Sequence, residues 1–227
     1  QEGKVQVNFG ASYGLRKVTK MVDVLNPYEF VMWQQELDQK SFNYGTFDDL
    51  EIYKSYTDTD YQGEIFGRTG NQQQYNISVS GGNKDTKFNI SYSRNDEKSI
   101  MLNSGFAKDN INAKINTKIN KWLTFDFNAR LSYQKVKGTG SGADDNQSSA
   151  TTSVNARSVV FAPVEKLISG GSDDDENVNN ARYTPIEILN ATYKRVSRFQ
   201  QNYNAGVNWE PVKGLKFRSE FGYGWKY

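Results

Sequence analysis

The residues best suited to chemistry in this sequence are carboxylates, because its 227 residues include no Cys and no His. Without His the commonest general base and metal ligand is missing, and without Cys there is no disulfide framework or thiolate metal site. Glu29 and Glu36 are candidates for the two acids that flank a glycosidic bond, but sequence spacing does not establish their separation, and a predicted helix explains both as capping or surface residues. We therefore expect no enzyme, no catalytic residue and no cofactor.

Two loop segments could bind ions or phosphate. The acidic run 173–176 (Asp-Asp-Asp-Glu) offers the carboxylate oxygens that Ca²⁺ prefers, but it places Val178 and Thr184 at positions six and twelve, which disagrees with an EF-hand. The spacing favours a solvated loop and leaves calcium binding open. The segment 67–70 (Gly-Arg-Thr-Gly) lacks the preceding strand, the Lys and the following helix of a phosphate loop, so no nucleotide site is indicated.

Composition narrows the class of protein. The 28 Lys and Arg residues are interspersed with 26 Asp and Glu residues, which does not suggest a nucleic-acid partner. The mean hydropathy is −0.77 and the sequence has no apolar run of about 18 residues, so a helical membrane protein is excluded. A low mean is compatible with a membrane barrel, whose strands alternate apolar and polar residues.

Such a two-residue alternation recurs along the chain. It appears at 5–13, 74–79, 87–92, 110–119, 123–134, 199–209 and 215–225. Several of these segments run to ten or more residues, which suits the 9 to 11 residues of a membrane strand better than the 5 or 6 of a globular one. About seven or eight strands are predicted, and the predicted fold class is all-β, part of a large antiparallel transmembrane β-barrel.

The alternation assigns each strand two faces. We expect one face to meet lipid, and it carries Val79, Ile90, Ile115, Phe127, Val207 and Phe217. We expect the other face to meet the interior, and it carries Asn76, Asn89, Asn116, Asn128, Asn204 and Arg218.

The connections alternate in length, as they do in outer-membrane barrels. Short turns are predicted at 81–86, 120–122 and 211–214, a longer connection at 94–107, and long loops at about 23–72 and 137–197. Aromatic residues mark two girdles, with Trp122 and Trp209 beside short turns and Tyr13, Tyr92, Tyr133 and Tyr223 towards the other end. Aromatics also favour strands in any β-sandwich, so a soluble all-β carbohydrate-binding module is the alternative.

Two segments within the long loops have helical signals. Asn26-Pro27-Tyr28-Glu29 predicts a capped helix through about Leu37, in a loop expected to be extracellular, and its stripe of Phe30, Trp33 and Leu37 is typical of packing. The segment 183–187 (Tyr-Thr-Pro-Ile-Glu) predicts a short helical turn, whereas the glycine-rich segment 138–142 predicts loop.

An ordered series of motifs resembles the early barrel of SusC/RagA-like TonB-dependent outer-membrane transporters. The motifs are Tyr-Gly-Leu-Arg-Lys-Val at 13–18, Asn-Pro-Tyr-Glu-Phe at 26–30, Thr-Asp-Tyr-Gln-Gly-Glu-Ile-Phe at 59–66, Tyr-Asn-Ile-Ser-Val-Ser-Gly-Gly at 75–82, Asn-Ser-Gly-Phe at 103–106 and Asn-Lys-Trp-Leu at 120–123. The series is more specific than any single motif, and the resemblance runs from about residue 4 to residue 227.

The resemblance implies that residues 1–227 are a partial barrel domain of a longer protein. It implies a barrel of 22 strands with a plug inside it and a TonB box, neither of which is found in these residues. It also implies the outer membrane as location, and active import of a glycan or peptide energised by TonB. The implied partners are a SusD-like surface lipoprotein, TonB through a segment absent here, the solute and membrane lipid; individual solute-binding residues stay unknown.

Overall fold

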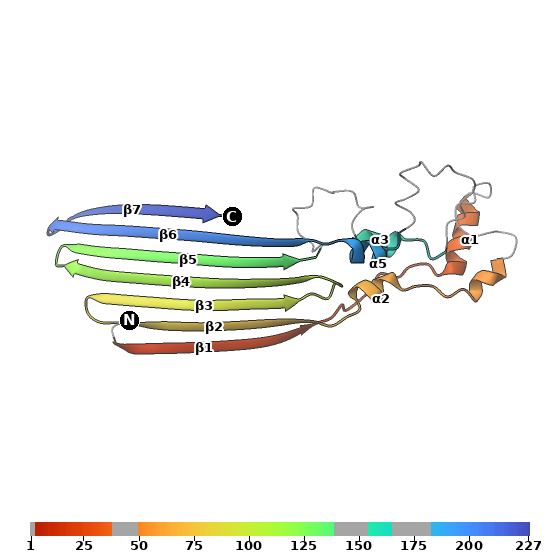
Figure 1. Ribbon diagram of the computed structural model, residues 1–227, viewed down its shortest axis with the longest axis horizontal. Helices are drawn as coiled ribbons and strands as arrows, with labels where there is room; N and C mark the ends of the chain where they lie inside the picture. Colours follow the sequence, from red (N-terminus) through yellow and green to blue (C-terminus); the bar gives the residue numbers. More distant parts are fainter. Residues whose placement is uncertain (1–2, 38–49, 139–153, 165–182) are drawn as a thin grey trace.

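The computed structural model describes residues 3–37, 50–138, 154–164 and 183–227, and its main feature is one antiparallel sheet (Figure 1). Seven strands lie side by side in chain order. They are β1 (Gly3–Arg16), β2 (Gly70–Gly82), β3 (Thr86–Lys98), β4 (Gly105–Asn120), β5 (Leu123–Lys137), β6 (Arg195–Val212) and β7 (Leu215–Lys226). The predicted all-β fold is confirmed, and among the described residues β1 and β7 each have one unpaired edge.

Tight turns join the strands at one end of the sheet. Residues 83–85, 121–122 and 213–214 make these turns, at the three places predicted to be short. The Asn83 side chain accepts hydrogen bonds from the backbone N–H groups of Asp85 and Thr86, at 2.9 and 2.8 Å, and the Asn120 side chain accepts one from the N–H of Trp122 at 2.9 Å. Asn in these positions therefore fixes the turn through its own side chain, which determines the register of the hairpin.

The connection predicted at 94–107 is shorter than expected, because β3 and β4 continue to Lys98 and back from Gly105. Only residues 99–104 lie between the two strands. Charged residues fall on both faces of this stretch and hide its alternation in the sequence. The structure pairs them, since the guanidinium of Arg94 contacts the carboxylate of Asp109 on the neighbouring strand at 3.1 Å.

The described helices lie beyond the other end of the sheet (Figure 1). They are α1 (Pro27–Leu37), α2 (Tyr61–Phe66), α3 (Val154–Val160) and α5 (Pro185–Ala191), with a 3₁₀ helix η1 (Leu50–Lys54). Both predicted helices are confirmed. Asn26 and Glu29 cap α1 through two reciprocal hydrogen bonds of 2.9 and 3.0 Å, so the capping role expected of Glu29 is confirmed.

A matching capping box starts α5, where the backbone N–H and the hydroxyl of Thr184 donate to the Glu187 carboxylate at 2.8 and 3.0 Å. These two hydrogen bonds lower the pKa of Glu187 below its ordinary value.

The predicted packing stripe of α1 is wrong for two of its three residues. Trp33 is 46% exposed and Leu37 is 63% exposed, whereas Phe30 is partly buried and the fully buried side chain is Val31. Helical spacing alone does not show which side of α1 meets η1; the contact of Val31 with Tyr53 decides it.

The helices pack on the connections rather than on the sheet. Ile65 of α2, Met101 of the 99–104 connection and Leu189 of α5 form one buried cluster. The backbone N–H of Leu102 donates to the carbonyl of Ile65 at 2.9 Å, and the guanidinium of Arg68 donates to the carbonyl of Ser99 at 2.8 Å. Both long connections are thereby fixed to the short one between β3 and β4.

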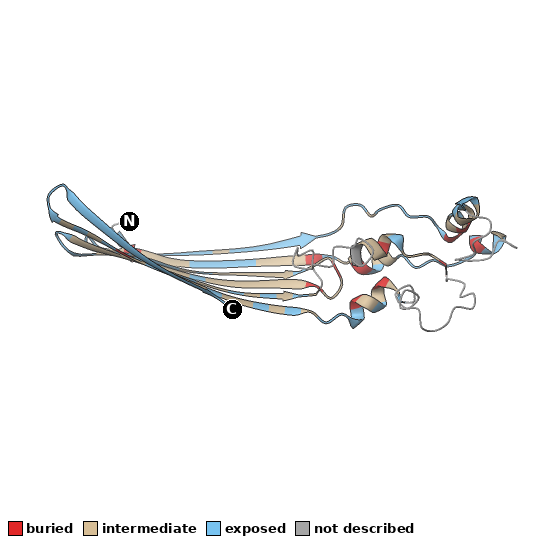
Figure 2. Cartoon of the chain, turned by 90° about the horizontal axis from the view of Figure 1, so that it is seen from above, coloured by how far each residue is buried: buried red, intermediate tan, exposed pale blue. Residues whose placement is uncertain are grey.

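None of the described helices is long and apolar enough to cross a membrane. The sheet itself contains no hydrophobic core, since the buried hydrophobic residues of the described chain are Val31, Tyr53, Ile65, Met101, Val164 and Leu189, all of them outside the strands (Figure 2). The sheet thus has two uncovered faces, and the chemistry of each face is what the fold displays.

Candidate functional site

The register of the strands confirms the predicted division into two faces. Residues directly opposite each other in an antiparallel pair lie on the same face. Val79 lies opposite Ile90, and Ile115 lies opposite Phe127. On the other face Asn128 lies opposite Asn204. The remaining predicted residues follow by alternation, so all six apolar residues share one face and all six polar residues share the other.

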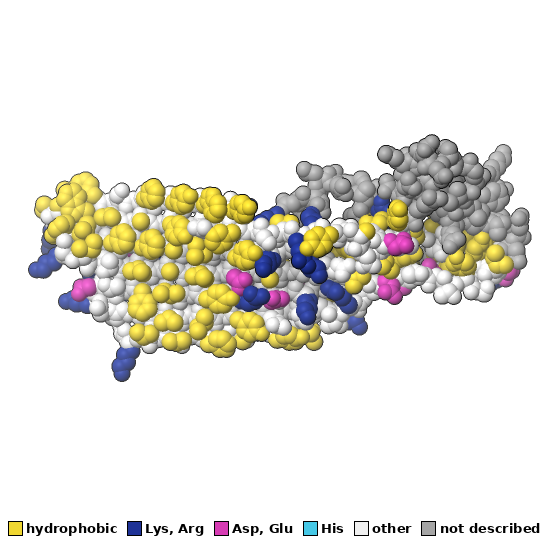
Figure 3. Space-filling view, viewed as in Figure 1, with side chains coloured by type: hydrophobic (Ala, Val, Ile, Leu, Met, Phe, Trp, Pro, Cys, Tyr) yellow, Lys and Arg dark blue, Asp and Glu magenta, His cyan; other side chains and the backbone are white. Residues whose placement is uncertain are grey.

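The apolar face forms a continuous band over the strands (Figure 3). Its side chains are uncovered, with Phe9 71% exposed and Phe221 69% exposed. On β5 the band runs from Leu123 to Tyr133, which is about 34 Å along the strand at about 3.4 Å per residue. At the tilt of about 40° usual in membrane barrels this corresponds to about 26 Å along the membrane normal, close to the apolar height of about 25 Å found in such barrels.

Aromatic side chains border the band near the turns. Trp209 and Phe217 lie opposite each other, with ring centroids 5.5 Å apart, and Trp122 is in the adjacent turn. The predicted aromatic border at this end is confirmed.

At the loop end Tyr133 packs edge-to-face on Phe199 at 6.4 Å. Tyr223 does not reach that end, because the register places it opposite Tyr203, inside the band. Trp225 and Tyr227, stacked at 6.0 Å, lie nearer the loop end of β7 instead.

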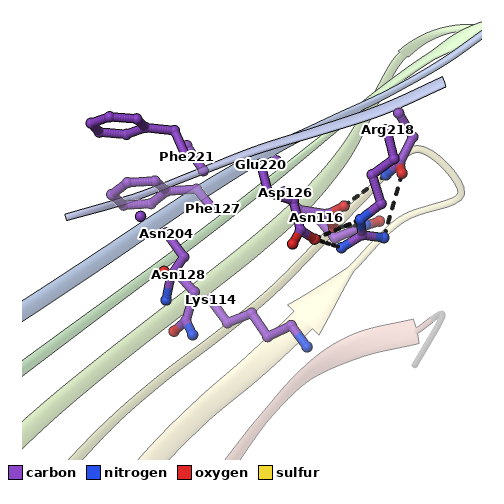
Figure 4. Close-up of a pocket in the computed structure, with 13 residues that line it drawn as sticks. Lys114, Asn116, Asp126, Phe127, Asn128, Asn204, Arg218, Glu220 and Phe221 are labelled. Carbon is purple, nitrogen blue, oxygen red and sulfur yellow. Dashed lines mark hydrogen bonds and ion pairs between the residues drawn. The ribbon is translucent and has the colours of Figure 1, made fainter. Parts of the chain in front are cut away.

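The polar face is hollowed near the turns (Figure 4). The hollow has a volume of about 710 Å³, and polar side chains of β4, β5, β6 and β7 line most of it. Asp126 is at its centre: Asn116 of β4 donates to one carboxylate oxygen, and Asn208 of β6 donates to the other at 3.0 Å. Asp126 therefore joins three consecutive strands through hydrogen bonds that lie across the polar face.

Arg218 of β7 donates to the side-chain oxygen of Asn208 at 3.4 Å, which extends this network to β7, and it pairs with Glu220 on its own strand. Figure 4 shows Phe127 and Phe221 projecting away from the polar groups, to the opposite side of the sheet. Gly222 leaves room for the side chain of Asn204, since a Cβ there would lie 3.0 Å from its oxygen.

A second polar network lies towards the loop end of the same face. The guanidinium of Arg16 contacts Glu97 and Gln72, each at 2.6 Å, and Gln72 donates to Asn95 at 3.2 Å. These side chains join β1, β2 and β3. Side-chain hydrogen bonds and ion pairs thus join neighbouring strands at both ends of the polar face. This face carries charged groups whose transfer into lipid would be costly.

The residues that the sequence analysis considered for catalysis, phosphate binding or calcium binding form no common site on the polar face among the described residues. Glu29 caps α1 and Glu36 is an exposed residue near the end of the same helix. Gly67 ends α2, donating its N–H to the carbonyl of Gly63 at 2.7 Å, so the segment 67–70 follows a helix rather than preceding one. The acidic run 173–176 lies outside the described residues, and calcium binding there stays open.

Comparison with known proteins gives one related sequence and several similar folds. No protein-family model matches the chain. The chain is 24% identical over 228 residues to TonB-dependent receptor P3 of Formosa agariphila, an alignment that covers 97% of this chain and 21% of the relative. Its fold is similar to one chain of the RagAB peptide importer in the closed-closed state (TM-score 0.68) and in the open-open state (TM-score 0.69).

The two RagAB alignments have 17% sequence identity and cover 100% and 99% of this chain, and 28% of the RagAB chain in each case. At that identity the structures show the fold. The chain thus spans about a fifth of its curated relative and under a third of the solved structures. The resemblance to SusC/RagA-like TonB-dependent transporters is confirmed, and the sheet matches one piece of such a barrel.

Proposed function

We propose that this chain forms part of the wall of an outer-membrane β-barrel that imports a large nutrient, a glycan or a peptide, into the periplasm. The observation that carries the proposal is the uncovered apolar band, about as tall as the apolar part of a bilayer, on a sheet whose reverse face is polar. Lipid covers the band, and the polar face lines the barrel.

A soluble carbohydrate-binding module, the alternative function, fits the same band less well. A soluble sandwich buries one face of each sheet against the other sheet, to form a core about 10 Å thick. Among the described residues no strand contributes to a buried core, and no second sheet covers either face. The strands of this chain are 12 to 18 residues long, which is longer than the strands of about 3 to 10 residues usual in a soluble domain.

The two free edges of the sheet require further strands. Backbone N–H and C=O groups along β1 and β7 would each cost several kcal/mol if left unpaired in lipid. Strands of the same protein outside residues 1–227 therefore pair with β1 and β7 and close the barrel. This is consistent with a relative about five times as long as the matched segment.

The same relatives support the proposed energy source and partners. The related sequence has the name TonB-dependent receptor, which supports import driven through TonB. The solved structures are of the RagAB peptide importer, which supports a SusD-like lipoprotein on the loop side of this barrel and makes peptides one solute class to test. Helices α1 and α5 and the connections that carry them then face the outside of the cell.

Membrane fractionation of the full-length protein tests the location. We expect the protein to stay in the outer-membrane fraction through high-salt washing and to leave it only in detergent, because hydrophobic contact with lipid holds it. Release by salt alone would favour the soluble alternative.

Uptake assays test transport itself. Cells with and without the gene take up labelled peptides and labelled oligosaccharides, in the presence and absence of an uncoupler of the proton gradient. We expect uptake of one solute class to require both the gene and the gradient. Uptake that is unchanged by deleting the gene, for both solute classes, would refute the proposed transport.

A further inference from the structure

Four basic side chains extend from the apolar side of the sheet just beyond the band. This basic rim consists of Lys98 of β3, Lys135 and Lys137 of β5, and Arg195 of β6. Lys98 and Lys137 both lie opposite Gly105, and Lys137 lies opposite Arg195, so these residues share one face. Tyr133, Lys135 and Lys137 alternate along β5, which places the basic rim on the side that carries the apolar band.

The position of the basic rim corresponds to the headgroup layer of a membrane. Lys135 and Lys137 follow Tyr133 by two and four residues, which is about 5 and 10 Å further along the membrane normal at about 40° tilt. The polar layer on each side of a bilayer is about 5 to 8 Å thick. Lys135 therefore lies within that layer, and Lys137, with Lys98 and Arg195 level with it, lies just outside, where a long basic side chain reaches back to the phosphates. Figure 3 shows Lys and Arg side chains gathered on this face between the band and the helical end.

No carboxylate of the described residues pairs with the basic rim, unlike the charge beside it. Two of its cations lie over aromatic rings: the ammonium of Lys135 is 5.2 Å from the ring centroid of Tyr133, and the guanidinium of Arg195 is 5.0 Å from that of Tyr193. Arg94 is level with Tyr133 on the same face. Its guanidinium pairs with Asp96, two residues further along β3, at 2.8 Å and with Asp109 at 3.1 Å. Within the described parts of the chain, neither Lys98, Lys135, Lys137 nor Arg195 has an ion pair with a carboxylate.

All four side chains are exposed. Lys137 and Arg195 are two like charges directly opposite each other on neighbouring strands, which destabilises the sheet. An anion between them would reduce that cost.

The space between the cations suits a phosphate group. Lys98 and Lys137 lie on either side of Gly105, two strand spacings or about 10 Å apart. Because Gly105 has no side chain, none projects from β4 between Lys98 and Lys137 at this position. Lysine and arginine are the usual ligands of phosphate oxygens, as a point charge and as a planar fork respectively.

We propose that the basic rim binds the phosphate groups of an anionic lipid in the membrane leaflet on the loop side, while the acyl chains of that lipid cover the aromatic end of the band. The inference rests on the proposed function, since it requires the apolar band to be in a membrane. It adds a specific lipid site to a surface that otherwise meets bulk lipid. Lipid bound there reduces the repulsion between Lys137 and Arg195 and holds β5 against β6.

Lipid binding to the purified full-length protein tests the site. The variant K135Q/K137Q/R195Q removes three charges from the basic rim, and K87Q/K108Q/K114Q removes three from the polar face as a matched control. Native mass spectrometry in detergent measures the affinity for bisphosphorylated lipid A and for the same lipid after its phosphates are removed. A gel-mobility shift on heating confirms that each variant has folded.

We expect the unmodified protein to prefer the phosphorylated lipid by at least about ten-fold. One basic residue near an anionic lipid surface strengthens binding by roughly five-fold, so the basic-rim variant should bind on the order of 100-fold more weakly. The control should bind like the unmodified protein, and excess inorganic phosphate should not displace the lipid. If K135Q/K137Q/R195Q does not fold, K137Q alone should weaken binding by roughly five-fold.

Three results would overturn the inference: equal affinity for the phosphate-free lipid, an equal loss of affinity in the control, or displacement by inorganic phosphate. The last would indicate a site for free anions. A protein that salt releases from membranes would instead refute the proposed function, so the two failures are distinguishable.

Discussion

Arginine substitutions along β5 test which face of the sheet meets lipid and how deep each residue of that face lies in the bilayer. Outward positions on this strand are two residues apart, and each residue rises about 2.6 Å along the membrane normal at about 40° tilt. Taking the middle of the stretch from Leu123 to Tyr133 as the bilayer centre, Phe127 lies about 3 Å from the centre and the two ends lie about 13 Å from it.

The expected cost follows from that depth. Arginine on the lipid face destabilises a membrane barrel by about 2 to 4 kcal/mol at the midplane and by about 0 to 1 kcal/mol near the interfaces. Phe127→Arg should therefore lower the folding equilibrium constant by about 30-fold to 900-fold. Leu123→Arg and Tyr133→Arg should lower it by less than about six-fold.

Asn128→Arg is the matched control, because Asn128 neighbours Phe127 and faces the polar hollow. Urea titration of the full-length protein in phospholipid vesicles, with the folded fraction read from gel mobility, measures each change. Equal destabilisation by Phe127→Arg and Asn128→Arg, or a cost that does not decrease towards Leu123 and Tyr133, would refute the assignment of this face to lipid.

Three further predictions concern topology, loop packing and the sheet edges. A membrane-impermeant maleimide added to intact cells should label Tyr193→Cys and not Lys213→Cys, in full-length protein with any other Cys replaced. Tyr193 is on the loop side and Lys213 is in the turn between β6 and β7. The reverse labelling pattern would show that the topology is inverted. Leu189→Ala should destabilise the cluster with Ile65 and Met101 by about 2 to 5 kcal/mol, measured as faster amide hydrogen exchange at 99–104. Leu37→Ala, at a 63% exposed position, should leave that exchange unchanged. Equal effects of the two substitutions would show that the cluster does not hold the connections. Residues 1–227 expressed alone should aggregate in water because the apolar band and two strand edges are uncovered, and a folded water-soluble monomer in gel filtration would contradict the incomplete-barrel interpretation.

The strands and their faces could be predicted because alternation is a local property. Each residue of the band alternates with a polar residue, so the assignment of Phe127 to one face and Asn128 to the other needs no knowledge of the neighbouring strands. The turns at 83–85 and 121–122 could be predicted for the same reason, since Asn83 and Asn120 fix them with their own side chains.

What the sequence did not reveal depends on contacts between distant residues. Helices α2 and α3 and the 3₁₀ helix η1 are short, and α2 is fixed by packing of Ile65 against Met101 and Leu189, which are 36 and 124 residues away in the chain. The end of β3 was missed because Arg94 and Asp96 look like a loop until Asp109 is known to lie opposite. The networks around Asp126 likewise need the register of β4, β5 and β6 before their partners can be named.

The polar face has a further role, because in a membrane the apolar face alone does not determine the register. A slip of one residue would turn every side chain of a strand to the other face, and the apolar band opposes it. A slip of β5 by two residues keeps its apolar side chains in lipid, so the apolar face opposes that slip weakly. The same slip would move Asp126 away from Asn116 and Asn208 and break its hydrogen bonds to both. The cost of these lost hydrogen bonds to a carboxylate then opposes the slip. The hydrogen bonds across the hollow therefore hold the strands in the register that gives the opposite face its continuous apolar band.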